Sequence, residues 1–470
     1  MRYVSTRGKA PAVGFEEALL AGLAPDGGLY MPERFPVWSK AELEKLAGLD
    51  YPALAAALLA PYVEGFMAQS ELEALARKAY RGFAHPAVVP LSQSGLNEWA
   101  LELFHGPTLA FKDLALQLLG PLFDRALKGR GERVTVLVAT SGDTGSAAIE
   151  ALGDKAQIAL AVLHPKGRIS EVQRRQMTTV DAANVHNIAI EGTFDDCQAL
   201  VKALFNDAAL RAELNLAAVN SINWARIMAQ AVYYVAAALA LGAPARALAF
   251  AVPTGNFGDV FAGHVASLMG LPVARLLVAT NRNDILARFF ATSEYCLSEV
   301  VPTLSPSMDI QVASNFERLL YLLCGRDGLA VARLMERFAR EGRLAVEPAR
   351  LDQARALYGA RAVSDEETLA MIARLHRESG RLVDPHSATG FAALRATGAP
   401  GGEPAVVLCT AHPAKFPQAV ARATGVSPEP PPRLAEIMGK RERYTTLAND
   451  VGALKDHLRR AVAPARERVA

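Results

Sequence analysis

The sequence predicts an α/β fold built around parallel sheets. From residue 90 onward, apolar and β-branched segments of strand length alternate with helical segments. Polar turns that contain glycine follow several of these segments directly. In a parallel sheet such turns lie at the carboxyl ends of strands, where α/β proteins bind their ligands. The expected strands are 134–139, 158–164, 185–190, 247–252, 273–279 and 405–409.

Length and composition are typical of a multidomain protein of the cytoplasm. A chain of 470 residues can bury the cores of two or three domains. Its 50 basic and 48 acidic residues give a formal charge of +2, which predicts neither a nucleic acid nor a membrane partner. The four cysteines have no metal-ligand or disulfide spacing, so we expect no metal site and a reducing compartment. The longest apolar run, 231–241, is too short to cross a bilayer, which takes about 20 residues.

Lys112 is the first residue that suggests an enzyme. It stands in the segment HGPTLAFKD, between Phe111 and a run of leucine and alanine, so its charge is expected to be partly desolvated at the start of an apolar helix. A lysine amine in such surroundings can attack an aldehyde. A lysine whose stem packs on Phe111 and whose ammonium stays in water is the structural alternative.

Two polar turns after strands are suited to anions. One comprises Thr140, Ser141, Gly142, Asp143 and Thr144, which follow strand 134–139 and precede a helix at 146–152. Its backbone amides and hydroxyls suit a carboxylate such as that of an amino acid, whereas an ordinary helix cap needs only one polar residue.

The other turn comprises Gly255, Asn256, Phe257, Gly258 and Asp259, between strand 247–252 and a helix from residue 260. Its two glycines let the backbone approach a phosphate, with the amides of 255–259 as donors. The chain contains neither GxGxxG nor GxxxxGK[ST], so a nucleotide is disfavoured. A reactive lysine combined with two such turns indicates pyridoxal phosphate as the cofactor.

Two further segments offer polar groups. Asn220, Ser221 and Arg226 open an apolar helix at 227–241 and could form a second phosphate pocket, or simply a capped core helix with a solvated arginine. Thr410 ends strand 405–409 and could face a pyridine nitrogen, or form a plain strand-terminal turn.

These motifs resemble the threonine synthase family, in the long-chain branch of bacteria and yeast. The likeness runs along nearly the whole chain, through MRYVSTRG, DGGLYMP, HGPTLAFKD, ATSGDTGSAA, NSINWAR, PTGNFGD, SPSMDIQVASNFERLLY, DPHSATG and TAHPAKF. The resemblance implies a fold-type-II pyridoxal-phosphate enzyme, similar to the tryptophan synthase β chain. Such a fold has two open, twisted, mainly parallel sheets flanked by helices.

The resemblance also implies a division into domains. A mainly helical accessory domain would occupy residues 1–88, which carry helical patterns and none of the polar turns. A small α/β domain at 105–242 would carry the Schiff-base lysine and the substrate loops. It would be inserted in a large cofactor-binding domain at 89–104 and 243–470.

Individual roles follow from the resemblance as expectations. Lys112 would hold the cofactor as a Schiff base and move protons, the turn at 255–259 would bind the cofactor phosphate, and Thr410 would face the ring nitrogen. The turn at 140–144 would bind the substrate carboxylate, with Asp143 near the phenolic oxygen of the ring. Asn220, Ser221 and Arg226 would bind the phosphate of the substrate. DPHSATG and SPSMDIQ match the family without a role for their single residues.

The implied activity is that of a carbon-oxygen lyase acting on phosphates, the last step of threonine biosynthesis. O-phospho-L-homoserine and water would give L-threonine and phosphate by γ-elimination and addition of water at Cβ. A phospho-lyase that yields 2-oxobutyrate, ammonia and phosphate is the nearest alternative. A dehydratase for free serine or threonine is disfavoured by the extra phosphate pocket, and a non-catalytic ligand-binding relative by the retained Lys112. No obligate protein partner is evident.

Overall fold

The computed structural model describes residues 1–467, which form two compact units. Unit 1 contains residues 1–19, 23–115 and 221–428, and unit 2 contains residues 20–22, 116–220 and the chain from 429 onward. Helix α5 (Lys112–Arg130) begins in unit 1 and continues into unit 2. The domain boundaries expected from the sequence stay a prediction.

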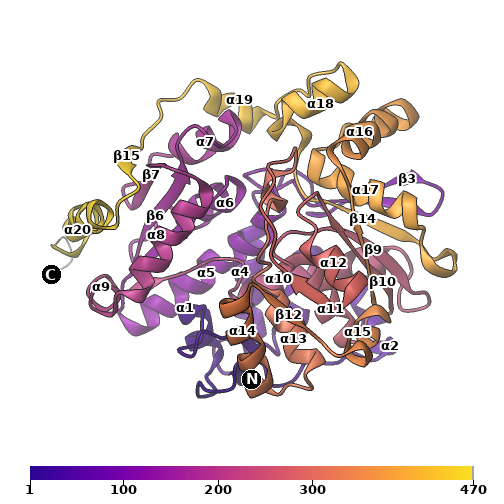
Figure 1. Ribbon diagram of the computed structural model, residues 1–470, viewed down its shortest axis with the longest axis horizontal. Helices are drawn as coiled ribbons and strands as arrows, with labels where there is room; N and C mark the ends of the chain where they lie inside the picture. Colours follow the sequence, from indigo (N-terminus) through magenta and orange to yellow (C-terminus); the bar gives the residue numbers. More distant parts are fainter. Residues whose placement is uncertain (468–470) are drawn as a thin grey trace. The chain divides into compact units, whose positions relative to one another are not determined.

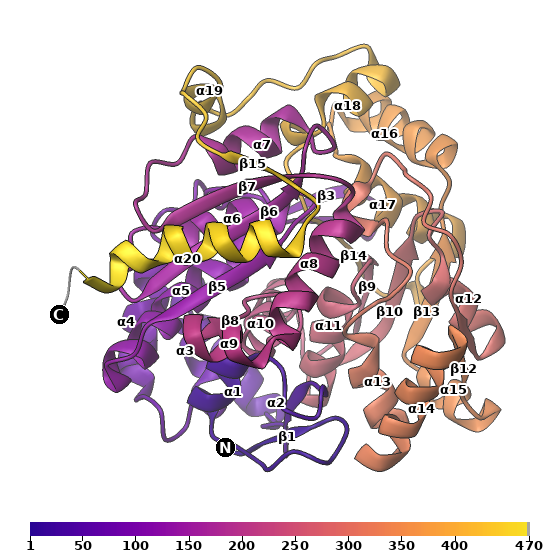
Figure 2. The same cartoon turned by 60° about the vertical axis from the view of Figure 1, so that its left-hand side comes forward.

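Unit 1 is built on a six-stranded sheet in the order β13-β10-β9-β14-β4-β3. Every neighbouring pair is parallel except β3 and β4, which form an antiparallel hairpin at the edge. Figure 2 shows β14, β9, β10 and β13 side by side. The strands are β3 (Leu91–Gly95), β4 (Glu98–Glu102), β9 (Leu248–Pro253), β10 (Val273–Thr280), β13 (Tyr358–Ala362) and β14 (Ala405–Cys409).

Helices cover both faces of this sheet, which explains why its inner strands are apolar throughout. One face packs on α16 (Asp365–Ser379) and α17 (Pro385–Thr397), and buries Phe391 completely. On the other face lie α10 (Trp224–Ala240) and α11 (Gly258–Leu268), which Figure 1 shows beside β9 and β10. Gly263 of α11 is needed for this approach, because a Cβ there would lie 2.8 Å from both Leu276 and the Tyr234 ring.

Three of the polar segments expected from the sequence leave adjacent strands of this sheet. The loop that leads to Lys112 follows β4, Thr410 follows β14, and Gly255 lies just beyond the end of β9. Because β14 pairs in parallel with both β4 and β9, these three segments leave the sheet at the same edge. The topology therefore gathers them into one site.

The remaining parts of unit 1 flank the sheet. Residues 1–88 contain a short antiparallel pair of strands and helices, as the helical patterns predicted. The elements of that segment are β1 (Tyr3–Ser5), α1 (Phe15–Ala21), β2 (Tyr30–Pro32), α2 (Lys40–Leu46), α3 (Tyr51–Leu59) and α4 (Gln69–Tyr80). The others are α12 (Ile285–Thr292), β11 (Glu294–Cys296), α13 (Phe316–Leu323), α14 (Gly328–Glu341), β12 (Arg343–Ala345), α15 (Pro348–Arg355) and α18 (Pro417–Thr424).

Unit 2 is built on a five-stranded, wholly parallel sheet in the order β15-β7-β6-β5-β8. One face packs on α8, α9 and α20, and Figure 2 shows α8 and α20 in front of the strands. The strands are β5 (Val134–Ala139), β6 (Ile158–Pro165), β7 (Val185–Glu191), β8 (Leu216–Ala217) and β15 (Thr445–Ala448). The helices are α6 (Asp143–Leu152), α7 (Glu171–Thr178), α8 (Phe194–Asn206), α9 (Ala208–Leu214), α19 (Pro432–Met438) and α20 (Val451–Glu467).

All six expected strands exist, each within one residue of its predicted limits at either end. The sequence pattern also predicts a helix at 447–460. This prediction is wrong at its start, because β15 extends to Ala448 and α20 begins at Val451. Three helices begin earlier than expected, so their polar first residues are already helical: α6 at Asp143, α10 at Trp224 and α11 at Gly258.

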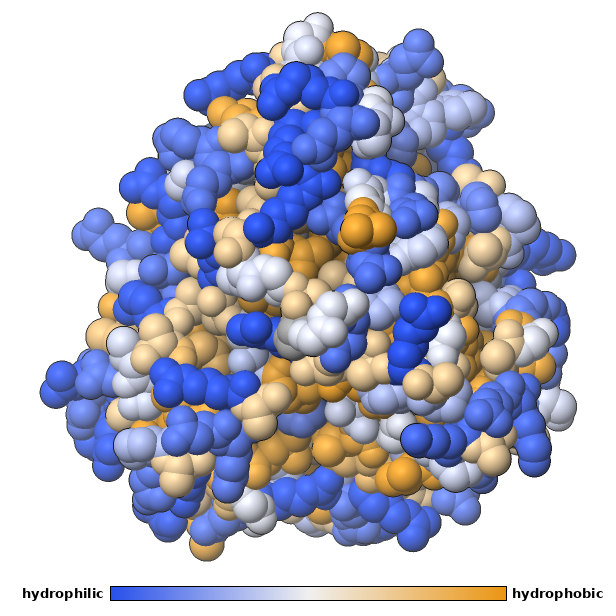
Figure 3. Space-filling model, turned by 90° about the vertical axis from the view of Figure 1, so that its right-hand side faces the viewer, coloured by the Kyte–Doolittle hydropathy of each residue, from blue (hydrophilic) through white to orange (hydrophobic). Residues whose placement is uncertain are grey.

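The surface is mixed in character. On the face drawn in Figure 3, hydrophobic residues form several separate areas among polar and charged ones. No helix within residues 1–467 is both long and apolar enough to span a membrane. All four cysteines are free thiols.

Candidate active site

Lys112 is held beside Thr410 by backbone contacts. Ala110 forms a β-bridge with Ala411, and the amide of Phe111 donates to the carbonyl of Thr410 at 2.9 Å. Lys112 is half-buried as the first residue of α5, and its Nζ lies 4.9 Å from the centroid of the Phe111 ring. The expected place at a helix start is therefore confirmed, with partial burial of the side chain, and the role of Lys112 stays a prediction.

The rest of the HGPTLAFKD segment is a rigid turn. The Asp113 carboxylate, which is fully buried, accepts from the Thr108 amide and the Thr108 hydroxyl at 2.7 Å each. A Cβ on Gly106 would lie 2.5 Å from the Asp113 side chain, so only glycine fits there. The buried Lys415 amine donates to the Thr108 carbonyl at 2.8 Å. Sequence reasoning gave Asp113 and Lys415 no role, although both lie inside quoted motifs.

The glycine turn after β9 has the geometry of a phosphate cradle. Phe257 adopts a left-handed conformation (φ 63°), which turns the chain into the first residue of α11. Among residues 1–467, the amides of positions 255–259 donate to no protein acceptor. A Cβ on Gly255 would come within 3.1 Å of Met308 and of the Ser307 carbonyl. The amides without acceptors at a helix start could bind a phosphate group, and the close contacts of Gly255 leave no room for a side chain in this turn.

Asp259 contributes to this turn through its backbone, because its side chain points elsewhere. The buried carboxylate accepts from Tyr233 at 2.5 Å and from Tyr234 at 2.9 Å. Its second oxygen, Oδ2, has no partner among the described residues. Burial raises the pKa of Asp259 to about 6, against the opposing effects of the two tyrosines and Lys112.

Thr410 is held by the DPHSATG motif. Its amide donates to Ser387 Oγ at 3.0 Å, and Ser387 in turn donates to the fully buried Asp384. Asp384 also accepts from the amide of His386 at 2.9 Å and lies 2.8 Å from its Nδ1, while His386 Nε2 accepts from the Ser307 amide at 3.2 Å. The two motifs without assigned residues thus connect Thr410 to the segment that presses on Gly255.

The NSINWAR segment places its arginine inside the protein. Asn223 caps α10 by accepting from the Ala225 amide at 3.0 Å, which leaves Arg226 in the first helical turn with 3% of its surface exposed. Burial lowers the pKa of Arg226 to about 10, so it stays charged at neutral pH. The alternative of a solvated arginine at the edge of a core helix is therefore wrong. Ser221 and Asn220 immediately precede this helix and are half-buried.

The turn at 140–144 belongs to unit 2 and is fixed by its own side chains. Thr140 Oγ1 accepts from the amides of Gly142 and Gly145 at 2.9 Å each. Gly142 has φ 137°, a conformation that other residues rarely adopt. Asp143 is buried and accepts from Gln173 at 2.9 Å. Ser141 is half-buried, so its hydroxyl and Thr144 remain the side chains best placed to meet a ligand.

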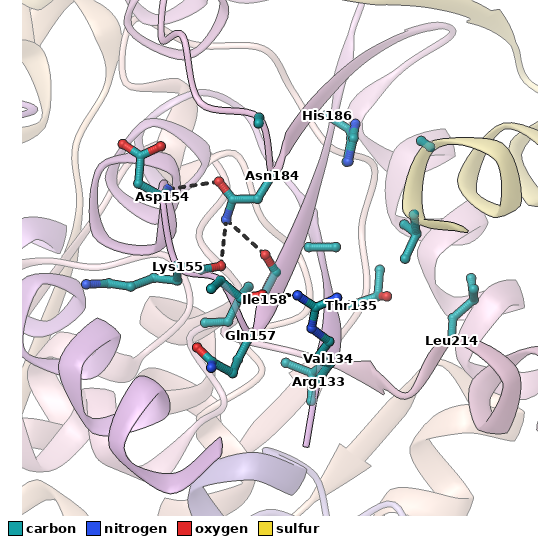
Figure 4. A pocket seen from close by; sticks show the side chains of 15 residues that line it. Arg133, Val134, Thr135, Asp154, Lys155, Gln157, Ile158, Asn184, His186 and Leu214 are labelled. Carbon is teal, nitrogen blue, oxygen red and sulfur yellow. Dashed lines mark hydrogen bonds between the residues drawn. The ribbon is translucent and has the colours of Figure 1, made fainter. Parts of the chain in front are cut away.

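A separate cavity of about 320 Å³ lies at the other edge of the unit 2 sheet, near the starts of β5, β6 and β7. Asn184 at its centre is already bonded to the Asp154 amide and to the carbonyls of Lys155 and Ile158 (Figure 4). None of the residues expected to be catalytic lines this cavity. It is therefore not part of the candidate active site.

Comparison with known families gives three consecutive matches. The family described as "Threonine synthase N terminus" matches residues 2–80, "Pyridoxal-phosphate dependent enzyme" matches residues 87–351, and "Threonine synthase, C-terminal" matches residues 387–458. Together they cover most of the chain. The third match contains Thr410, and the second contains all the other candidate site residues.

Known proteins are similar over almost their full lengths. The threonine synthase of Pseudomonas aeruginosa is 55% identical over 456 residues, which cover 97% of each chain. The crystal structure of a threonine synthase from Brucella melitensis with bound pyridoxal phosphate matches with a TM-score of 0.95 and 50% identity, over 98% of this chain and 99% of the other. The yeast threonine synthase structure matches with a TM-score of 0.92 and 38% identity, over 98% and 99%.

Proposed function

The chain belongs to the threonine synthase family of pyridoxal-phosphate-dependent lyases, and we propose that it converts O-phospho-L-homoserine and water to L-threonine and inorganic phosphate. The observation that carries this proposal is a pair of anion sites in unit 1. One is the glycine turn at 255–259, and the other is the buried Arg226 at the start of α10. A cofactor phosphate accounts for the first site, and a substrate with its own phosphate accounts for the second.

Lys112 is the proposed cofactor-binding and proton-moving residue. When bound, pyridoxal phosphate supplies an electron sink that stabilises negative charge on the substrate carbons. The Lys112 amine removes the proton from substrate Cα and later returns one. Its place beside Thr410, on adjacent strand ends, supports this role because Thr410 is the residue assigned to the ring nitrogen.

The other residues bind and orient the substrate. Arg226 and Ser221, with Asn220, hold the phosphate that leaves from Cγ. The amide and hydroxyl groups of the turn at 140–144 hold the carboxylate, and Asp143 takes the place assigned to the phenolic oxygen of the ring. Cβ loses a proton as phosphate leaves from Cγ, and Cγ then gains a proton. The hydroxyl group of water is added at Cβ, which makes threonine, and the remaining proton of water goes to the released phosphate.

The decisive experiment supplies O-phospho-L-homoserine to the purified holoenzyme and measures phosphate, threonine and 2-oxobutyrate together. Threonine and phosphate in equal amounts support the proposal. Equal amounts of 2-oxobutyrate, ammonia and phosphate would instead identify a phospho-lyase. Lys112→Ala is the control and should form no product by either route.

We also propose that the enzyme works in the cytoplasm on a small-molecule substrate. The four free thiols support this location, since reducing compartments keep cysteines unpaired.

A further inference from the structure

Arg318 is a fully buried arginine in the first turn of α13. Its Nη2 donates to the carbonyls of Ile222 at 2.6 Å and Tyr30 at 3.2 Å, and its Nη1 donates to Asn315 Oδ1. Within residues 1–467 no carboxylate pairs with its guanidinium, and Nε has no acceptor. The carboxylate of the adjacent Glu317 is taken up by Thr6 and Arg7.

Asn315 connects Arg318 to the glycine turn. Its backbone amide and its side-chain Nδ2 both donate to the carbonyl of Asn256, at 3.1 and 3.2 Å. Its Nδ2 would also lie 3.1 Å from a Cβ on Gly258. Asn315 therefore fixes the carbonyl in the middle of the turn, while the amides of positions 255–259 donate to no acceptor among the described residues.

The same guanidinium reaches the second anion site. Ile222, whose carbonyl it binds, lies between Ser221 and the Asn223 cap of α10. The Arg318 Cζ also lies 5.9 Å from the ring of Trp224, two residues before Arg226. One buried side chain thus braces both segments that are assigned to phosphates.

An unpaired buried cation is costly unless an anion compensates it. Burial lowers the pKa of Arg318 to about 9, so the group remains charged at neutral pH. All of its hydrogen-bond partners are neutral oxygens, and the adjacent Glu317 carboxylate, which is already paired with Arg7, offsets its charge only in part. Anions bound at the two phosphate sites would add to this compensation.

We propose that Arg318 is a positioning residue for phosphate binding: it acts on the glycine turn through Asn315 and on the 220–226 segment through its bond to the Ile222 carbonyl. The effect on cofactor binding requires only membership of the pyridoxal-phosphate family. The effect on the phosphate of the substrate rests on the proposed function. Arg318 touches neither ligand in this assignment, so its effect should fall on phosphate recognition and not on chemistry at Lys112.

The test compares pyridoxal phosphate with pyridoxal, which lacks the phosphate, in titrations of apoprotein followed by absorbance. For Arg318→Gln we expect the Kd of pyridoxal phosphate to rise about tenfold or more, since charge-assisted bonds are lost, while the Kd of pyridoxal changes little. Arg318→Lys keeps the charge and should recover part of the preference. The inhibition constant of inorganic phosphate against substrate should rise in parallel for Arg318→Gln.

Asn315→Asp is a second test, which separates an effect on phosphate binding from misfolding of Arg318→Gln. It keeps an acceptor for Arg318 and pairs its charge, which offsets the lost bond from Asn315 Nδ2 to the Asn256 carbonyl, so thermal stability should stay near that of the wild type. It also places negative charge behind the turn, so pyridoxal phosphate should bind at least about tenfold more weakly. Arg326→Gln is the matched control, because Arg326 likewise donates to backbone carbonyls, those of Pro32 and Glu33, and lies 5.2 Å from an aromatic ring, Phe35.

An equal loss of affinity for pyridoxal and for pyridoxal phosphate in Arg318→Gln would overturn the proposal. So would a selective loss of affinity for pyridoxal phosphate in Arg326→Gln, or an unchanged affinity for the cofactor in Asn315→Asp. A wild-type protein with no preference for the phosphorylated compound would also overturn it. Threonine formation by the wild-type holoenzyme is measured separately, so a failure of the proposed function is seen independently.

Discussion

Two buried arginines in unit 1 serve different purposes. Arg226 lies at a helix start, where backbone amides add to its charge, and Arg318 binds the Ile222 carbonyl just before that helix. An arginine at the position of Arg226 can form two parallel hydrogen bonds to a phosphate, which a lysine cannot do. Arg226 should therefore contribute to both binding and turnover.

For Arg226→Gln we expect kcat/KM for O-phospho-L-homoserine to fall about 100-fold, with a higher KM and a lower kcat. Steady-state kinetics at saturating cofactor measure both constants. Inhibition by homoserine, which has no phosphate, is the control and should change little. Values of KM and kcat within twofold of the wild type would refute the role of Arg226.

Asp259 allows a prediction about pH. Its folded pKa of about 6 is raised above the ordinary value near 4, because the carboxylate is buried and Oδ2 has no partner. The folded state therefore holds a proton between about pH 4 and 6 that the unfolded state has released. Burial of Asp259 therefore does not lower the free energy of unfolding below about pH 4, where the group is protonated in both states. It lowers this free energy progressively as pH rises, and the full loss is reached above about pH 6.

Asp259→Asn removes this cost. Relative to the wild type, the free energy of unfolding of the variant apoprotein should rise by about 2–3 kcal/mol as pH increases from 4.5 to 7. Urea denaturation at several pH values measures the difference. Asp207→Asn is the control and should show almost no change over this pH range, since the backbone bond to Leu210 and the Lys455 ammonium lower the pKa of Asp207, so that its contribution is lost only below about pH 4. A difference that does not change with pH would contradict the burial argument.

At the scale of elements, strand positions were predictable because both sheets are covered on two faces. Continuous apolar runs such as 134–139 and 405–409 then mark strands almost to the residue. The exposed β3 hairpin and the edge strand β15 carry no such run, so their sequences gave no strand signal. Their pairing depends on neighbours that are distant in the chain.

The same limit applies to the candidate site. Gly255 and Thr410, which come just after predicted strands, and Lys112, which opens an apolar helix, could be selected from their local pattern. Residues that act through contacts distant in sequence could not. Asn315 lies 59 positions from the Asn256 carbonyl that it holds, and Ser387 lies 23 positions from Thr410. Only the motif likeness marked these segments.

The junction of α17 and β14 provides a prediction at this scale. Ser387→Ala would leave the buried Thr410 amide without an acceptor and would remove one of the donors to Asp384, at a cost of about 1–3 kcal/mol. We expect the variant to bind the cofactor with a shifted absorption maximum and to turn over about tenfold more slowly. Ser379→Ala is the control, because its hydroxyl only donates to the Leu375 carbonyl at 3.0 Å. An unchanged spectrum and kcat in Ser387→Ala would argue against this bracing of Thr410.

At the scale of the whole molecule, the chain returns to unit 2 after completing unit 1. Residues from 429 onward add β15 to the edge of β7 and lay α20 on the core of unit 2. Leu454 and Leu458 are completely buried there. The Lys455–Asp207 and Arg459–Glu213 ion pairs surround them but are partly exposed, so the apolar contacts provide most of the attachment.

Leu458→Ala should therefore weaken unit 2 selectively. Loss of a buried leucine side chain costs about 2–4 kcal/mol, whereas Lys455→Gln should cost less than about 1 kcal/mol. Because each unit has its own core, hydrogen exchange should accelerate at the amides of β5, β6 and β7 and stay near wild-type rates at those of β9 and β14. Equal acceleration in both sheets would show that the two cores unfold as one cooperative unit.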